Sequence, residues 1–225
     1  FTYEYKTSSS SWSYTPSWDS SFADNGFAAG TRFADIDGDG LPDAVVSYYN
    51  PAWGNPHARY VYINDGDGFT ASGSFTVPDD EDVAFWNDGA PGGGHLVDVN
   101  GDGLADLVES DFSDDEFKFY INDGDSWEYD SSWDTPVNWD VKEGYRFIDV
   151  NGDGLPDKVL SHYEGSLQHS VCLNTGSGFA GGCNSYIIPN LHPQDDSDFA
   201  FTYDNGTYTE VWYGGIADIN GDGLA

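Results

Sequence analysis

Apolar and polar residues alternate along several short runs of this chain, and turn-forming residues separate the runs. Residues 59–64, 117–122 and 170–174 each alternate in this way and then enter Asn-Asp-Gly or Asn-Thr-Gly. Alternation with a period of two, followed by such a turn, is typical of a β-strand entering a hairpin. Helical spacing of apolar residues is almost absent. The pattern therefore predicts an all-β protein built from short antiparallel strands.

A nine-residue segment rich in aspartate and glycine occurs four times. The copies begin at residues 35, 98, 149 and 218 and read Asp-Ile/Val-Asp/Asn-Gly-Asp-Gly-Leu-Pro/Ala-Asp; the fourth lacks its ninth residue because the sequence ends at Ala225. A β-patterned run precedes each copy, and a second one follows each complete copy. This recurring order of strand, loop, strand and hairpin indicates repeated units of roughly 50–70 residues.

The repeat divides the whole chain into units. Residues 1–12 align with residues 117–127, so the sequence begins within a unit. The approximate units are 1–30 (partial), 31–93, 94–144, 145–214 and 215–225 (partial). Antiparallel units of this size suit β-propeller blades and are too long for β-helix turns, although a linear β array is an alternative. We predict a single, partial β-propeller domain over residues 1–225. It has roughly four blades, three complete and one split between the termini, and it can form part of a larger ring.

The composition fits a folded acidic protein. Hydrophobic residues make up 38% and aromatic residues 16%, which is enough to bury a core. Forty acidic residues against seven basic ones give a net charge of −33. Such a charge argues against nucleic acid and anionic lipid as partners and favours bound cations. No run approaches the roughly 18 apolar residues of a membrane span, so we expect no membrane insertion.

The nine positions of the repeated loop carry the candidate chemistry. Positions 1, 3, 5 and 9 hold oxygen-bearing side chains, position 7 can offer a backbone carbonyl, and positions 4 and 6 are glycines. Calcium takes six to eight oxygen ligands, and the absence of His and Cys from these loops argues against zinc. A simple turn does not need so many carboxylates, whose crowding is unfavourable without a cation. We therefore expect calcium here, and we interpret Asn-Asp-Gly at 64–66 and 122–124 as turns alone.

An EF-hand shares the first six residues of this loop but differs afterwards. It requires an acidic residue at position 12 and flanking helices. Position 12 is Val46 in the first copy and Leu160 in the third, and only Glu109 of the second copy fits. The flanking runs are patterned as strands. The EF-hand is therefore rejected.

The motif Phe/Leu-x-Asp-x-Asn/Asp-Gly-Asp-Gly-Leu-x-Asp, followed by Ile/Leu-Asn-x-Gly-x-Gly-Phe, resembles the FG-GAP/VCBS repeats of integrin-α-type β-propellers. The resemblance covers nearly the whole chain and implies one Ca²⁺ in each outer loop of a seven-bladed ring. Roughly four units do not close such a ring alone. Three to four ions are implied here, because the fourth loop lacks its ninth position. The implied ligands, with the leucines acting through their carbonyls, are Asp35, Asp37, Asp39, Leu41, Asp43, Asp98, Asn100, Asp102, Leu104, Asp106, Asp149, Asn151, Asp153, Leu155, Asp157, Asp218, Asn220, Asp222 and Leu224.

The two cysteines, Cys172 and Cys183, lie close together in the sequence. In a secreted protein they form a local disulfide, whereas in the cytosol two thiols are expected. We expect the disulfide and an extracellular location, either secreted or at the cell surface.

Repeats similar to FG-GAP/VCBS repeats occur in secreted bacterial adhesins, lectins, polysaccharide lyases and toxin shells.

A structural, adhesion or assembly module is the leading functional hypothesis, with a protein or glycan partner outside the cell. Five scattered histidines and the absence of Gly-x-Ser-x-Gly give no support for an enzyme. Open blade edges would favour self-association. The first alternative is a carbohydrate-binding propeller, and a less favoured one is the non-catalytic propeller part of a polysaccharide-degrading enzyme or toxin. Tryptophans at matched positions are expected in the core between blades: Trp12, Trp18, Trp127 and Trp133. The others pack between blades or contact a ligand: Trp53, Trp86, Trp139 and Trp212.

Overall fold

The computed structural model describes residues 4–8, 11–14, 30–49, 57–79, 83–87, 90–111, 116–136, 145–164, 167–180, 183, 202–204 and 209–211. Every element in these ranges is a β-strand, which confirms the all-β prediction. The strands are β1 (Glu4–Ser8), β2 (Ser11–Tyr14), β3 (Thr31–Ala34), β4 (Asp43–Tyr49), β5 (His57–Asn64), β6 (Phe69–Ala71), β7 (Trp86–Asn87), β8 (Ala90–Pro91), β9 (Gly94–Val97), β10 (Asp106–Asp111), β11 (Glu116–Asn122), β12 (Trp127–Tyr129), β13 (Thr135–Pro136), β14 (Tyr145–Ile148), β15 (Asp157–Glu164), β16 (Leu167–Cys172), β17 (Thr202–Asp204) and β18 (Thr209–Val211).

Two compact units make up the chain. The first comprises Phe1–Leu96, Gly103–Glu109 and Tyr120–Tyr129, and the second comprises Val97–Asp102, Ser110–Phe119 and Asp130–Ala225. Strands β1 and β2 pair as a separate two-stranded sheet. Within the described residues, no helix has the length and hydropathy that crossing a lipid bilayer would require.

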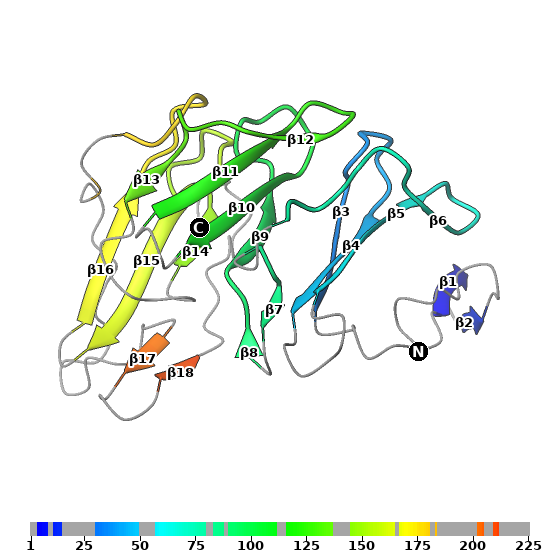
Figure 1. Cartoon of the computed structure of the whole chain (residues 1–225), viewed down its shortest axis with the longest axis horizontal. Coiled ribbons are helices and arrows are strands. Elements are labelled where there is room, and N and C mark those ends of the chain that lie inside the picture. Colours follow the sequence, from blue (N-terminus) through cyan, green and yellow to red (C-terminus); the bar gives the residue numbers. More distant parts are fainter. Residues whose placement is uncertain are drawn as a thin grey trace. The chain divides into compact units, whose positions relative to one another are not determined.

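The main sheet of the first unit has the strand order β6-β5-β4-β7-β8, and β3 also pairs with β4. Figure 1 shows β3, β4 and β5 side by side. Strand β3 is antiparallel to the first half of β4, whereas β7 is parallel to its last two residues. Our expectation of purely antiparallel strands is therefore wrong at β7. The chain leaves β6 and returns to β4 by a long connection, so no tight turn marks this pairing in the sequence.

The sheet formed by β14 to β18 repeats this plan in the second unit. Its order is β14-β15-β17-β18, with β16 also on β15. Strand β14 is antiparallel to the start of β15, and β17 is parallel to its end. A third sheet has the order β12-β11-β10-β9, with β13 pairing with β11. The sheets at β4 and β15 therefore share one arrangement, including an unexpected parallel strand at the same edge.

The larger hydrophobic cluster of the first unit lies on the face of the β4 sheet that carries Val45, and a smaller one with Ala44 and Val46 lies on the other face. Residues of β4 are buried on both faces, since Ala44, Val45 and Val46 all have no exposed surface. Burying a valine side chain completely contributes about 1.5–3 kcal/mol to the free energy of unfolding. The ring of Trp127 packs edge-on against Phe75 at 5.3 Å between centroids. The full cluster is Ile36, Val45, Val61, Phe75, Val77, Val83, Phe85, Ala105, Leu107 and Trp127.

Aromatic rings dominate the core of the second unit. Phe119 packs against Trp133 and Phe179, with centroid distances of 6.2 and 5.6 Å. Phe117 packs edge-on against Tyr145 at 4.3 Å. Trp127 and Trp133 are 7% and 5% exposed, so both are buried as predicted, while their place between blades stays a prediction. Trp18 and the side chain of Trp12 lie outside the described residues.

Candidate metal centre

The first loop, residues 35–43, curls around the carboxylate of Asp35. The backbone N–H groups of Gly38 and Gly40 donate to its two oxygens at 2.8 and 2.9 Å. Both glycines have positive φ, 82° and 86°, which side chains of L-residues disfavour. The two glycines of the motif are thus explained by the curl that brings later residues of the loop back towards Asp35.

Three carboxylates converge in this loop. Asp35, Asp37 and Asp39 each offer an oxygen within 4.8 Å of the others. The N–H of Asp39 donates to Asp37 at 3.2 Å, and the N–H of Leu41 donates to Asp39 at 2.8 Å. These local bonds orient the carboxylates without using all of their lone pairs. A set of hard oxygen donors at this spacing fits Ca²⁺.

The third loop, residues 149–157, is built in the same way. Asp149 accepts the N–H groups of Gly152 and Gly154 at 2.6 and 2.8 Å. In the second loop, Asp98 accepts the N–H of Gly101 at 2.7 Å. The first-position aspartate is therefore the centre of the curl in all three described loops.

Asparagine replaces aspartate at position 3 of the second and third loops. The side-chain amide of Asn100 donates to Asp102 at 2.9 Å, and that of Asn151 donates to Asp153 at 2.8 Å. An amide in place of a carboxylate lowers the negative charge of the loop and offers a neutral oxygen. The first loop is therefore the most strongly charged of the three.

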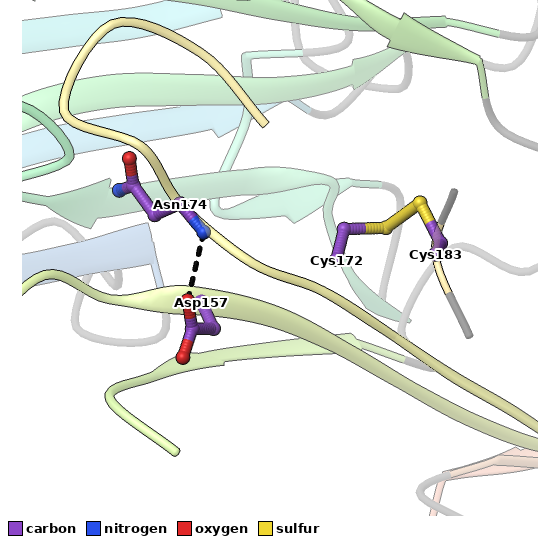
Figure 2. The surroundings of a disulfide bond; sticks show 4 residues. All are labelled: Asp157, Cys172, Asn174 and Cys183. Carbon is purple, nitrogen blue, oxygen red and sulfur yellow. Dashed lines mark hydrogen bonds between the residues drawn. A yellow bond between two sulfur atoms is a disulfide. The ribbon is translucent and has the colours of Figure 1, made fainter. Parts of the chain in front are cut away.

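The aspartate at position 9 is buried and joins the loop to a neighbouring hairpin. Asp43 has no exposed surface. Its two oxygens accept the N–H groups of Ile36 and Asn64, both at 2.8 Å. Asp157 likewise accepts the N–H of Asn174 at 2.8 Å (Figure 2). The ninth position thus has a structural role that the sequence pattern alone did not reveal.

Burial raises the pKa of Asp43 above its ordinary value. The N–H groups of Asn64 and Ile36 oppose this shift, and the carboxylates of Asp37 and Asp39 add to it. The pKa of Asp157 is raised by burial as well, and nearby carboxylates of its loop contribute in the same direction. Both buried carboxylates therefore lie in a field that a cation would relieve.

Three hairpin asparagines hold the candidate metal loops in place, a role that the sequence pattern did not predict. Asn64, Asn122 and Asn174 are 3%, 1% and 3% exposed. Each donates its backbone N–H, at 2.8 Å, to the ninth-position aspartate of the loop that precedes it in the sequence. Each side-chain oxygen accepts the N–H of the following turn glycine. The prediction of turns is confirmed, but the turns also hold the loops. Their recurrence after each loop was the available signal.

The remaining predicted ligands are placed as follows. Leu41, Leu104 and Leu155 are half-buried. Asp106 is buried and accepts the N–H of Asn122. The predicted ligands of the fourth loop lie outside the described residues: Asp218, Asn220, Asp222 and Leu224.

The predicted disulfide is present. Cys172, at the end of β16, is bonded to Cys183, which is 11 residues further along the chain. Figure 2 shows this bond near Asn174, which follows Cys172 by two residues. The bond thus ties down the segment that carries the hairpin asparagine of the third loop.

No family model matches the chain. A T-cell immunomodulatory protein homolog from Plasmodium yoelii yoelii is 30% identical over 173 residues, which cover 70% of this chain and 22% of that protein. The chain thus spans about a fifth of the length of this curated relative.

Two solved structures are also similar. The match to the Tc holotoxin pore of Photorhabdus luminescens covers 76% of this chain and 8% of the toxin chain, with a TM-score of 0.48 and 23% identity. A lectin of Agrocybe aegerita that recognises non-reducing terminal N-acetylglucosamine matches 67% of this chain and 36% of its own, with a TM-score of 0.45 and 19% identity. The chain is therefore similar to a minor part of each of these known proteins.

Proposed function

We propose that the repeated loops bind Ca²⁺ and that the ions brace an extracellular, non-enzymatic module for adhesion or assembly. The observation that carries the proposal is the convergence of Asp35, Asp37 and Asp39 within 4.8 Å. The buried carboxylate of Asp43 adds a fourth negative charge to the same loop. Three carboxylates at such close range, with a fourth in the same nine residues, are unfavourable unless a cation lies among them.

The proposed architecture is a β-propeller of the FG-GAP/VCBS kind. It is supported by the shared strand plan of the β4 and β15 sheets and by the loop that precedes each of these strands. Antiparallel units of this size suit blades arranged around an axis. The roughly four blades predicted in this sequence are proposed to belong to a larger ring.

The proposed location is outside the cytosol. The Cys172–Cys183 disulfide supports it, because such bonds persist in oxidising compartments. Similarity to a T-cell immunomodulatory protein homolog is consistent with it. We propose a protein or glycan as the partner, and self-association through open strand edges as a route to assembly.

Calorimetric titration of the chelator-treated chain with CaCl₂ tests the metal proposal. Wild-type protein should bind at least three ions, and Asp39→Ala and Asp153→Ala should each bind one ion fewer. Asp67→Ala is the matched control, because Asp67 is an exposed residue of a hairpin turn outside the loops. Absence of calcium binding to wild-type protein, or equal loss in all three variants, would contradict the proposal.

A carbohydrate-binding function is the second candidate. Three large rings of the first unit are about half exposed: Phe33 at 48%, Tyr60 at 46% and Tyr129 at 51%. Exposed aromatic faces can stack on sugar rings. A glycan array probed with wild-type and Tyr60→Ala protein, with and without chelator, checks this function. Glycan binding that requires both Tyr60 and calcium would favour it, whereas an array without signal would leave the adhesion or assembly module as the better proposal.

A further inference from the structure

The second loop contacts the first through the hairpin asparagine Asn122. The side-chain amide of Asn122 donates to the carbonyl of Ile36, position 2 of the first loop, at 2.8 Å. It also donates to the carbonyl of Ala105, position 8 of its own loop, at 3.2 Å. The N–H of Ala105 in turn donates to the carbonyl of Asp35 at 3.0 Å. One buried amide therefore holds the end of one loop against the start of the preceding loop.

The same contact recurs between the third loop and the second. The side-chain amide of Asn174 donates to the carbonyl of Val99 at 2.7 Å and to that of Pro156 at 3.1 Å. Val99 is position 2 of the second loop, and Pro156 is position 8 of the third. Because the donor and the acceptor positions are the same at both junctions, the contact is a recurring feature of the repeat.

An apolar contact accompanies each amide contact. A Cβ atom placed on Gly38 would lie 2.9 Å from Leu104, and one placed on Gly101 would lie 2.7 Å from Leu155. Both distances are shorter than real Cβ contacts allow. The position-7 leucine of one loop thus fills the space left by the position-4 glycine of the preceding loop. The positive φ of this glycine, 82° at Gly38 and 79° at Gly101, favours glycine there, and the leucine methyl group packs against it.

We propose that Asn122 and Asn174 are positioning residues that couple ion binding in each loop to ion binding in the preceding loop. The inference rests on the proposed calcium function. An ion held by the carbonyl of Leu104 would fix the neighbouring Ala105, whose N–H and carbonyl both take part in the junction. The backbone of Asp35 and Ile36 is then held in the form that presents the first-loop carboxylates. Coupling between two binding sites is reciprocal, so calcium binding is cooperative between adjacent loops.

Nuclear magnetic resonance of the ¹⁵N-labelled full chain can follow each loop separately. The amides of Gly40 and Gly154 donate to Asp35 and Asp149, so their cross-peaks report on the first and third loops. The chelator-treated chain is titrated with CaCl₂. Asp102→Ala removes a carboxylate of the second loop. It should raise the calcium Kd of the first loop, read from the Gly40 cross-peak, by at least about fivefold, which is the lower end of common coupling between sites. Asp153→Ala, in the non-adjacent third loop, should change it by less than about twofold.

A double-mutant comparison separates coupling from general damage. In an Asn122→Ala background, Asp102→Ala should no longer weaken binding at Gly40. In an Asn174→Ala background, which removes the equivalent amide at the other junction, the effect of Asp102→Ala should persist. Leu104→Ala provides a milder disruption of the same junction if Asn122→Ala does not fold.

Three outcomes would overturn the coupling. Equal weakening at Gly40 by Asp102→Ala and Asp153→Ala would show a loss of global stability instead. Ion binding at Gly40 that is unaffected by Asp102→Ala would show that the loops act independently, while leaving the calcium function intact. Cross-peaks that do not respond to calcium in wild-type protein would remove the proposed function and the coupling together.

Discussion

At the scale of single residues, the ninth-position aspartates combine burial with negative charge. Asp43 has no exposed surface, yet it accepts two backbone N–H groups, which favour its ionised form. The carboxylates of Asp37 and Asp39 oppose ionisation, and burial opposes it further. The same balance holds at Asp157. If the loops bind calcium as proposed, removing the ion should therefore destabilise the ionised form of these carboxylates most.

The pH dependence of stability should report this balance. Because the pKa of Asp43 and Asp157 is raised above the ordinary 3.8, the folded chain holds more protons than the unfolded chain just above that pH. In chelator, the free energy of unfolding should therefore fall as pH rises through this window. Calcium should reduce or reverse the fall by favouring the ionised carboxylates. Urea unfolding at a series of pH values, with and without CaCl₂, measures both curves. Parallel curves would contradict the expectation.

The side chain of Lys158 is buried, 6% exposed, directly after the ninth-position aspartate, where the first two copies have Ala44 and Leu107. Burial lowers its pKa to about 7, while the ring of Phe117, 4.4 Å from the ammonium nitrogen, partly supports the charge. Lys158→Leu should raise the free energy of unfolding at pH 7 by about 1–3 kcal/mol. Between pH 7 and 10.5 the unfolded chain holds the proton that the folded chain lacks, so the free energy of unfolding of wild-type protein rises with pH. The stability advantage of Lys158→Leu over wild type should therefore shrink across this range. A gain that grows with pH, measured by urea unfolding, would be inconsistent with this explanation.

At the scale of elements, the three described loops should differ in affinity. Residues 35–43 contain four aspartates, whereas residues 98–106 and 149–157 contain three, with asparagine at position 3. Since calcium affinity rises with the charge of the ligands, the first loop should bind most tightly. Asp37→Asn should weaken binding in the first loop, and Asn100→Asp should strengthen it in the second. Calcium titrations followed at each loop's glycine amides check both directions, and an unchanged order of affinities would contradict the charge argument.

The disulfide should stabilise the third hairpin. It closes a short loop of 11 residues and lies two residues before Asn174. Cys172→Ser with Cys183→Ser should lower the free energy of unfolding by about 3 kcal/mol. Amide exchange at Asn174, whose N–H donates to buried Asp157, should accelerate more than exchange at Asn64. Equal acceleration at the two asparagines would indicate that the bond acts on the chain as a whole.

Local elements could be predicted from the sequence because their signals are local. Alternation ending at Asn64 predicts a strand and hairpin, and Asp-x-Asp-Gly-Asp-Gly predicts a curled loop with oxygen donors. The parallel pairing of β7 with β4 has no such signal, because the two strands are joined by a long connection. The contact between Asn122 and Ile36 joins residues 86 apart in the sequence, so only the fold reveals it.

At the scale of the whole molecule, the net charge of −33 is the dominant electrostatic feature. Self-repulsion of this size destabilises a compact state, and bound cations at the loops would relieve it where the carboxylates are most crowded. Because the loops contact one another through buried amides, relief at one loop should support its neighbour. Ion binding and folding are therefore expected to be linked throughout the chain.

The melting temperature of the full chain in CaCl₂ and in chelator tests the central claim most directly. Each site held at a hundredfold excess over its Kd contributes about 2.7 kcal/mol, and each kcal/mol shifts the Tm of a chain this size by about 2–4 °C. With three or more sites, calcium should raise the Tm by at least about 10 °C. The same concentration of MgCl₂ should raise it much less, because Mg²⁺ demands a tighter octahedral site. An equal Tm in calcium and in chelator would contradict the claim that the loops bind calcium to brace this fold.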